Sequence, residues 1–148
     1  RSFIDTASIN EDLFKKSKDL TLKILESDTE EDIKKTVEQS FKKDFEVDKC
    51  MLEFYDNNAL DKIEETTGLS MHKGAIHCGS FSNEKMLFLF SDKKIESLVV
   101  AVIVIGEKIG LLKLGSYDRT KYLGDEDTTF IEYIRDILEK KLTSSYEK

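Results

Sequence analysis

The strongest constraint on the fold is an eight-residue apolar run, Leu98 to Ile105. Its β-branched residues favour a strand buried on both faces. A turn at 106–108 and a second, glycine-flanked run at 109–116 follow, so the two runs predict a β-hairpin in which Gly106 tolerates a positive φ. An amphipathic helix is predicted from Asp125 to Leu142. We therefore expect a β-hairpin at the centre of the sheet, followed by a helix that closes the fold.

The size and composition of the chain predict one cytoplasmic domain. With 148 residues, of which 39% are hydrophobic and 36% charged, it can bury a core without metals or disulfides. No apolar run approaches the ~20 residues that span a bilayer, and no secretory signal is recognisable, so we expect no membrane partner. Two cysteines are too few for a disulfide framework, and reduced thiols are expected. Because the chain begins with Arg1, we also expect an upstream segment to be missing.

The charge pattern argues against direct binding of nucleic acid. The formal net charge is −7, so the overall field repels phosphates rather than attracting them. Lysines such as Lys15, Lys16, Lys34 and Lys35 are interleaved with acidic residues, as on solvated helix faces. We expect no nucleic-acid partner.

The first helix is predicted over residues 9–26, and its apolar stripe allows two interpretations. The stripe falls at spacings of four, four, three and four: Ile9, Leu13, Ser17, Leu20 and Ile24. It can pack on the sheet of its own domain, or it can continue an upstream coiled coil and make the protein a homodimer. We accordingly divide the chain into an N-terminal helix, residues 1–26, as the end of an upstream coiled coil, and a domain over residues 27–148.

The remaining elements alternate between helix and strand signals. In chain order we expect a helix ending near Lys43, a strand over 47–56, a short helix over 59–67 ended by Gly68, one short strand within 69–78, and a helix over 83–90 capped by Ser82. Strands flanked by terminal helices indicate the α+β class, a sheet layered with helices.

Three motifs resemble a known family. They are Cys78-Gly79-Ser80-Phe81 followed by Leu89-Phe90; Gly110-Leu111-Leu112-Lys113-Leu114-Gly115-Ser116 with Asp118 and Tyr122; and, more weakly, Asn10-Glu11-Asp12-Leu13-Phe14. From about Ala7 to Leu142 the chain is similar to the proteobacterial GAF-like family catalogued as domain of unknown function 484. It departs from the family's usual Arg-Asp-Pro by carrying Tyr117-Asp118-Arg119.

The resemblance implies a GAF-like antiparallel sheet of about five to six strands, layered with N- and C-terminal helices, and an upstream helix that leads to dimers. GAF relatives bind cyclic nucleotides, tetrapyrroles or small metabolites, or serve only for dimerisation. Their ligand cleft lies over one sheet face, which here implies a roof formed by residues 67–90 and a rim formed by 116–122. The implied ligand contacts are His77, Ser80, Tyr117 and Arg119, with the cofactor unknown. The alternative is a cavity filled by side chains such as Met86, Phe88 and Phe90.

No residue pattern predicts an enzyme. The chain has neither a G-x-S-x-G motif nor a P-loop. His72, His77 and Cys78, even with Cys50, lack the paired spacings of a zinc site, so we predict no metal. A thiol-dependent reductase would need Cys50 and Cys78 within bonding reach, and Cys50 is more simply a core residue. We predict a non-enzymatic GAF-like regulatory or sensory module that binds a small molecule or mediates dimerisation, with a purely dimerising domain and this reductase as alternatives.

Overall fold

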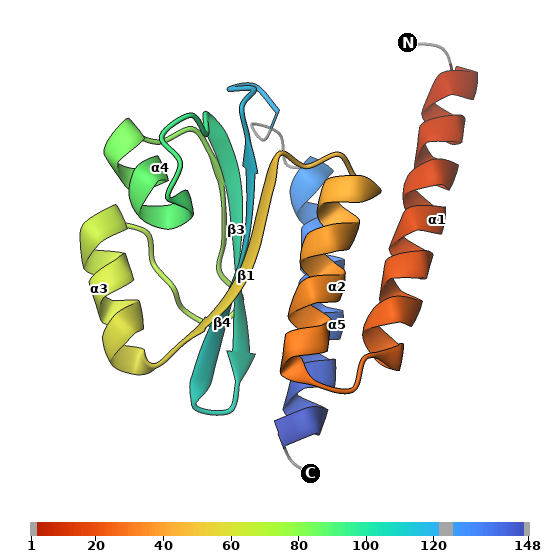
Figure 1. Cartoon of the computed structure of the whole chain (residues 1–148). Coiled ribbons are helices and arrows are strands. Elements are labelled where there is room, and N and C mark those ends of the chain that lie inside the picture. Colours follow the sequence, from red (N-terminus) through yellow and green to blue (C-terminus); the bar gives the residue numbers. More distant parts are fainter. Residues whose placement is uncertain (1–2, 122–125, 147–148) are drawn as a thin grey trace.

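The computed structural model describes residues 3–121 and 126–146. Along these residues the elements, in chain order, are α1 (Phe3–Glu26), α2 (Glu30–Lys43), β1 (Lys49–Tyr55), α3 (Asn57–Thr67), β2 (Ile76–Gly79), α4 (Asn83–Phe90), β3 (Ser97–Ile105), β4 (Lys108–Ser116) and α5 (Glu126–Tyr146). Figure 1 shows the sheet between two helical layers, with α3 and α4 on one face and α2 and α5 on the other. The α+β prediction is confirmed.

The predicted apolar run forms an interior strand. The sheet order is β1-β4-β3-β2, and every neighbouring pair is antiparallel. β3 pairs with β4 from Ser97↔Ser116 to Ile105↔Lys108, and six consecutive residues from Leu98 to Ile103 are fully buried. Gly106 makes the turn with a φ of 63°. The hairpin predicted from the sequence is therefore the centre of the sheet.

The described residues form four strands rather than the five to six that the family resemblance implied. The described segment between α3 and β2 turns at 72–75 through a bond from Ala75 N to His72 O, and no strand is assigned in it before Ile76. Only Ala75 extends the ladder of β2, because its carbonyl accepts a bond of 3.0 Å from Val102 N. The one short strand predicted within residues 69–78 is β2, which runs from Ile76 to Gly79.

The two faces of the sheet build two separate cores. Side chains alternate along each strand, so odd and even positions of β3 enter different cores. Toward α2 and α5 the core includes Val99, Ala101, Ile103, Leu52 and Phe41. Toward α3 and α4 it includes Leu98, Val100, Leu111, Met86 and Phe90. The sheet is thus covered on both sides by helices (Figure 1).

The short helices begin and end where the sequence predicts. Ser82 caps α4, since its side-chain oxygen accepts a bond from Lys85 N at 3.3 Å. Gly68 ends α3 with a φ of 74° in the left-handed region. These two residues fix the ends of the α3–α4 layer.

Helix α1 packs on α2 and α5 through only one side. Leu20 and Ile24 are buried in the same core as α2 and α5. Phe14, Leu22 and Leu25 are 73%, 48% and 55% exposed. The start of α1 reaches past the adjacent end of α2 (Figure 1). Among the described residues, no helix combines the length and hydrophobicity that a membrane crossing requires.

Candidate functional site

Three of the four predicted ligand residues come after strands that stop at the same end of the sheet. Gly79 is opposite Leu98 and Ser97 is opposite Ser116. Ser80 and Tyr117, which come next along the chain, therefore lie beyond the same end of the sheet, on either side of β3. Arg119 is exposed in the loop after Tyr117. The other rim residue of the resemblance, Tyr122, lies outside the described residues.

The fourth predicted residue, His77, lies within β2 on the face covered by α3 and α4. It is opposite Val100, which belongs to the core on that side. Its Nε2 lies 2.6 Å from the carbonyl oxygen of Ser70, in the segment after α3. Within the structure described, His77 thus joins β2 to that segment and is only half-buried.

Hydrogen bonds hold the loop that carries Tyr117. The carboxylate of Asp48 accepts from the backbone N–H of Tyr117 at 3.0 Å and from the hydroxyl of Ser116 at 3.3 Å. The buried hydroxyl of Ser97 donates to the carbonyl of Asp118 at 2.6 Å. The Tyr117 hydroxyl donates to Asp92 at 3.1 Å, and this bond to a negative charge raises the pKa of Tyr117. The loop is therefore anchored to the starts of β1 and β3 and to the chain after α4.

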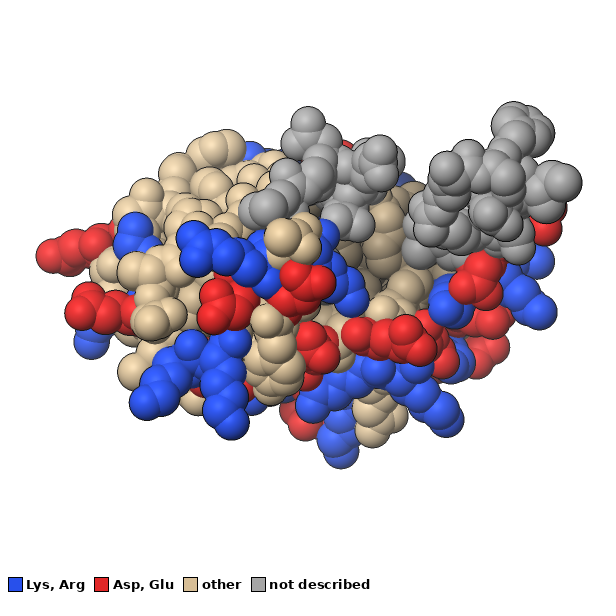
Figure 2. All heavy atoms as spheres, turned by 90° about the horizontal axis from the view of Figure 1, so that it is seen from above, with Lys and Arg blue, Asp and Glu red and all other residues tan. Residues whose placement is uncertain are grey.

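Charges of both signs surround this end of the molecule. Figure 2 views it from above and shows lysine and arginine side chains interleaved with aspartate and glutamate. The pKa of Asp92 is lowered chiefly by the backbone N–H of Lys94, and that of Asp118 by bonds from Thr120. A ligand here would meet anchored acids and exposed cations together.

Side chains of the predicted roof enter the core below it. Met86 and Phe90 of α4 are fully buried, as the alternative interpretation predicts, and Ile95 is buried beside them. Phe88 is 41% exposed and points elsewhere, because it falls on the outer side of the helix. A Cβ added at Gly115 would lie 2.9 Å from Ile95 Cδ1, so the glycine itself is needed for this close approach.

A buried polar cluster lies on the same sheet face, and sequence reasoning missed it. Lys113 is 3% exposed, and its Nζ donates to the carbonyl of Leu89 at 2.7 Å. The same Nζ is 3.5 Å from the carboxylate of Glu53 and 3.4 Å from the hydroxyl of Tyr55. The Tyr55 hydroxyl donates to Glu53 at 2.9 Å. The available signal was a lysine at an inward position of an otherwise apolar strand.

In the described part of the chain, the residues considered for a zinc site or a redox pair are not brought together. Cys50, Leu114, Val99 and Cys78 form one row across the four strands. Three strand spacings of ~4.8 Å separate the two cysteines by about 14 Å, twice the ~7 Å limit for a disulfide. His72 is in the exposed turn beside Lys73, and no group of three potential metal-binding side chains occurs among the residues described.

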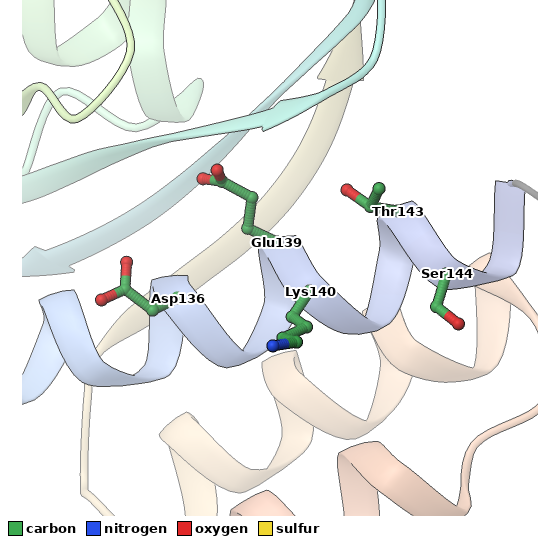
Figure 3. A pocket seen from close by; sticks show the side chains of 5 residues that line it. All are labelled: Asp136, Glu139, Lys140, Thr143 and Ser144. Carbon is green, nitrogen blue, oxygen red and sulfur yellow. The ribbon is translucent and has the colours of Figure 1, made fainter.

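Hollows lined by described residues occur outside the roof. One of about 480 Å³ lies on α5 and is lined by Asp136, Glu139, Lys140, Thr143 and Ser144 (Figure 3). Another of about 700 Å³ lies where the β3–β4 turn meets the end of β1, and Thr143 lines it too. A third, of about 400 Å³, lies at the junction of α1 and α2.

Comparisons with known proteins identify the fold and the family. A solved structure, the phycoerythrobilin-bound GAF domain from a cyanobacterial phytochrome, superposes with a TM-score of 0.67 over 93% of this chain and 97% of that chain, at 14% identity. At that identity the likeness establishes a GAF-like fold alone. No curated protein matches the sequence. The model of the family described as "Protein of unknown function, DUF484" matches residues 1–147, and the chain therefore belongs to that family.

Proposed function

We propose that this chain is a non-enzymatic regulatory module of the cytoplasm, which brings two copies together through α1. The observation that carries the proposal is the apolar side of α1 that its own domain leaves uncovered. Phe14, Leu22 and Leu25 are separated by eight and three residues, so they fall within one stripe of the helix. An adjacent side of α1 packs inward through Leu20 and Ile24. One helix thus has one side for its own core and one for a partner.

The size of the exposed side chains supports a specific contact. Complete burial of a large apolar side chain is worth about 1.5–3 kcal/mol. Phe14, with 73% exposure, has the most to gain from a partner. A second copy supplies an identical stripe, and a two-fold axis brings the two stripes together. We accordingly expect a symmetric pair of α1 helices.

Light scattering tests the pairing. The double variant Phe14→Glu/Leu25→Glu places charges on the stripe, and it should convert a dimer into a monomer with an unchanged circular dichroism spectrum. Phe88→Glu, on an exposed apolar residue of α4, is the matched control and should remain dimeric. A wild-type chain that stays monomeric at high concentration, or a double variant that stays dimeric, would contradict the proposal.

The second candidate function is binding of a small molecule, and the polar end of the sheet favours it. The neighbouring GAF domain holds phycoerythrobilin. In this chain Ser80, Tyr117 and Arg119 lie at one end of the sheet. His77 lies nearby in β2, on the sheet face covered by α3 and α4. This candidate needs α4 to move, because Met86 and Phe90 of that helix are buried in the core.

A thermal-shift screen with cyclic AMP, cyclic GMP and common metabolites tests the second candidate. A ligand that binds the folded state raises the melting temperature. Arg119→Ala and Tyr117→Ala should abolish that rise, and Tyr133→Ala, which removes an exposed tyrosine from α5, should preserve it. If no compound raises the melting temperature, the dimerisation function alone remains.

A further inference from the structure

The outer edge of β3 is only partly covered. β2 pairs with Leu98 to Ala101, and the ladder is then extended by the bond from Val102 N to Ala75 O. β3 itself continues to Ile105. Beyond Ala75, no described residue offers a backbone partner on this side of β3. The last part of the strand is therefore an open edge next to the hairpin turn.

The direction of the backbone groups follows from the antiparallel ladder. Peptide groups of alternate residues point to the same side of a strand. Because Val102 N points outward to Ala75, the N–H and carbonyl of Val104 point outward as well. The Val104 N–H donates to the carboxylate of Glu139 on α5, at 3.4 Å. That length is well above the usual ~2.9 Å, so the side chain is a weak occupant of a position that suits a strand carbonyl.

Acidic side chains face this edge. Figure 3 shows Asp136 and Glu139 on the part of α5 nearer the strand, and Lys140, Thr143 and Ser144 line the same hollow. Asp136 accepts from Arg135, whose guanidinium also donates to the carbonyl of Gly74. The hollow beside these residues has a volume of about 480 Å³. On the helix side, an incoming segment would meet the two carboxylates of Asp136 and Glu139 together with the ammonium of Lys140.

We propose that the open edge of β3, from Ile103 to Ile105, binds an extended segment of a partner protein by strand addition, and that the segment carries lysine or arginine. The backbone of the segment replaces the Glu139 carboxylate at Val104 N–H and donates to the carbonyl of Val104. Its basic side chains pair with Glu139, once released, and with Asp136. Strand addition draws affinity from main-chain bonds and specificity from the flanking side chains.

The site is separate from the dimer surface on α1. The edge belongs to β3 and α5, whereas Phe14 and Leu25 lie on α1, outside the α2–α5 layer (Figure 1). A dimer formed through α1 leaves both edges free, so one dimer can hold two segments. If the dimer test fails, the proposal for the β3 edge still stands. If the peptide test fails, the proposal for the α1 dimer still stands.

Nuclear magnetic resonance with defined peptides tests the proposal on the whole chain. The probe is acetyl-Lys-Val-Lys-Val-Lys-Val-amide, and the first control is the same peptide with alternate backbone nitrogens methylated, which keeps the charge but removes the donors on one side. The unmodified peptide should shift the amide signals of Ile103 to Ile105 and slow hydrogen exchange at Val104. The methylated peptide should shift neither.

A charge swap tests the role of the carboxylates. Wild type should bind the basic peptide at least about fivefold more tightly than the peptide in which each lysine is replaced by glutamate. Each exposed charge pair changes the dissociation constant by a factor of about two to five. Asp136→Lys/Glu139→Lys should reverse that preference. Glu65→Lys, on the exposed side of α3 across the sheet, should leave the preference unchanged.

Three results would overturn the proposal. Equal binding of the methylated peptide would show a purely electrostatic contact. Shifts confined to residues away from β3 and α5 would place the peptide elsewhere. Concentration-dependent shifts of Ile103 to Ile105 without any peptide would assign the edge to a second copy of this chain.

Discussion

Lys113 is the costliest side chain for this sheet to bury. A charged ammonium loses its hydration in the core, and burial therefore lowers the pKa of Lys113 below its ordinary 10.5, while Glu53 opposes the shift. In return the Nζ donates to the carbonyl of Leu89, which lies in the last turn of α4. A cation at a helix C-terminus is favourable, so Lys113 fastens the roof helix to β4.

The depressed pKa of Lys113 predicts how stability depends on pH. Between the lowered value and 10.5 the unfolded chain holds more protons at this site, so the free energy of unfolding rises with pH over that range. As the pH is raised toward about 10, wild type should therefore gain stability relative to Lys113→Met, by up to about 1 kcal/mol per pH unit. Denaturant titrations across this range measure the difference.

Two further residues bear on this measurement: Tyr55, which is a neighbour of Lys113, and Lys43, which is not. The pKa of Tyr55 is raised above 10.0 by burial and by Glu53, so its ionisation opposes the gain only above about pH 10. Lys43→Met removes an exposed lysine of α2 and should run parallel to wild type. A difference between wild type and Lys113→Met that does not change with pH would mean that Lys113 titrates as it does in the unfolded chain.

Elements with local signals could be predicted from the sequence, and contacts between distant elements could not. The β3–β4 hairpin, the Ser82 cap and the Gly68 ending follow from residue types within a few positions, and all three are confirmed. The Lys113 cluster joins β1, β4 and α4, so no local window contains it. The packing of α1 likewise depends on how α2 and α5, which are distant in the sequence, lie side by side on the sheet. The count of five to six strands was taken from relatives, and the described residues form four.

Helix α1 contributes to the stability of the domain through the side chains that it buries in the core. Leu20 is fully buried among side chains of α2 and α5, so Leu20→Ala should lower the free energy of unfolding by about 2–5 kcal/mol. Asp19→Ala, on an exposed side of the same helix outside the Phe14–Leu25 stripe, should change it by less than about 0.5 kcal/mol. Both are measured by urea denaturation of the whole chain. The boundary predicted at residue 26 treats α1 as the end of a coiled coil, and an unchanged stability of Leu20→Ala would favour that boundary.

In the molecule as a whole, the sheet separates two hydrophobic cores, and its width separates the two cysteines. Cys50 and Cys78 share the core face toward α2 and α5, yet they occupy opposite edge strands. The reductase alternative requires the two sulfurs to meet, and in this fold β4 and β3 lie between them. Only an unfolded chain, or one whose sheet has opened, can bring them together.

Thiol chemistry therefore reports on the integrity of the whole sheet. Cys50 is 4% exposed and burial raises its pKa, so its thiolate is scarce and shielded, whereas Cys78 is half-buried. In native buffer Cys78 should be alkylated at least about tenfold faster than Cys50, and diamide should give no intramolecular bridge. In denaturant both thiols should react alike and the bridge should form. Mass spectrometry of the digested chain measures each outcome. A Cys50–Cys78 bridge formed in native buffer would contradict the strand order, because it requires β1 and β2 to be neighbours.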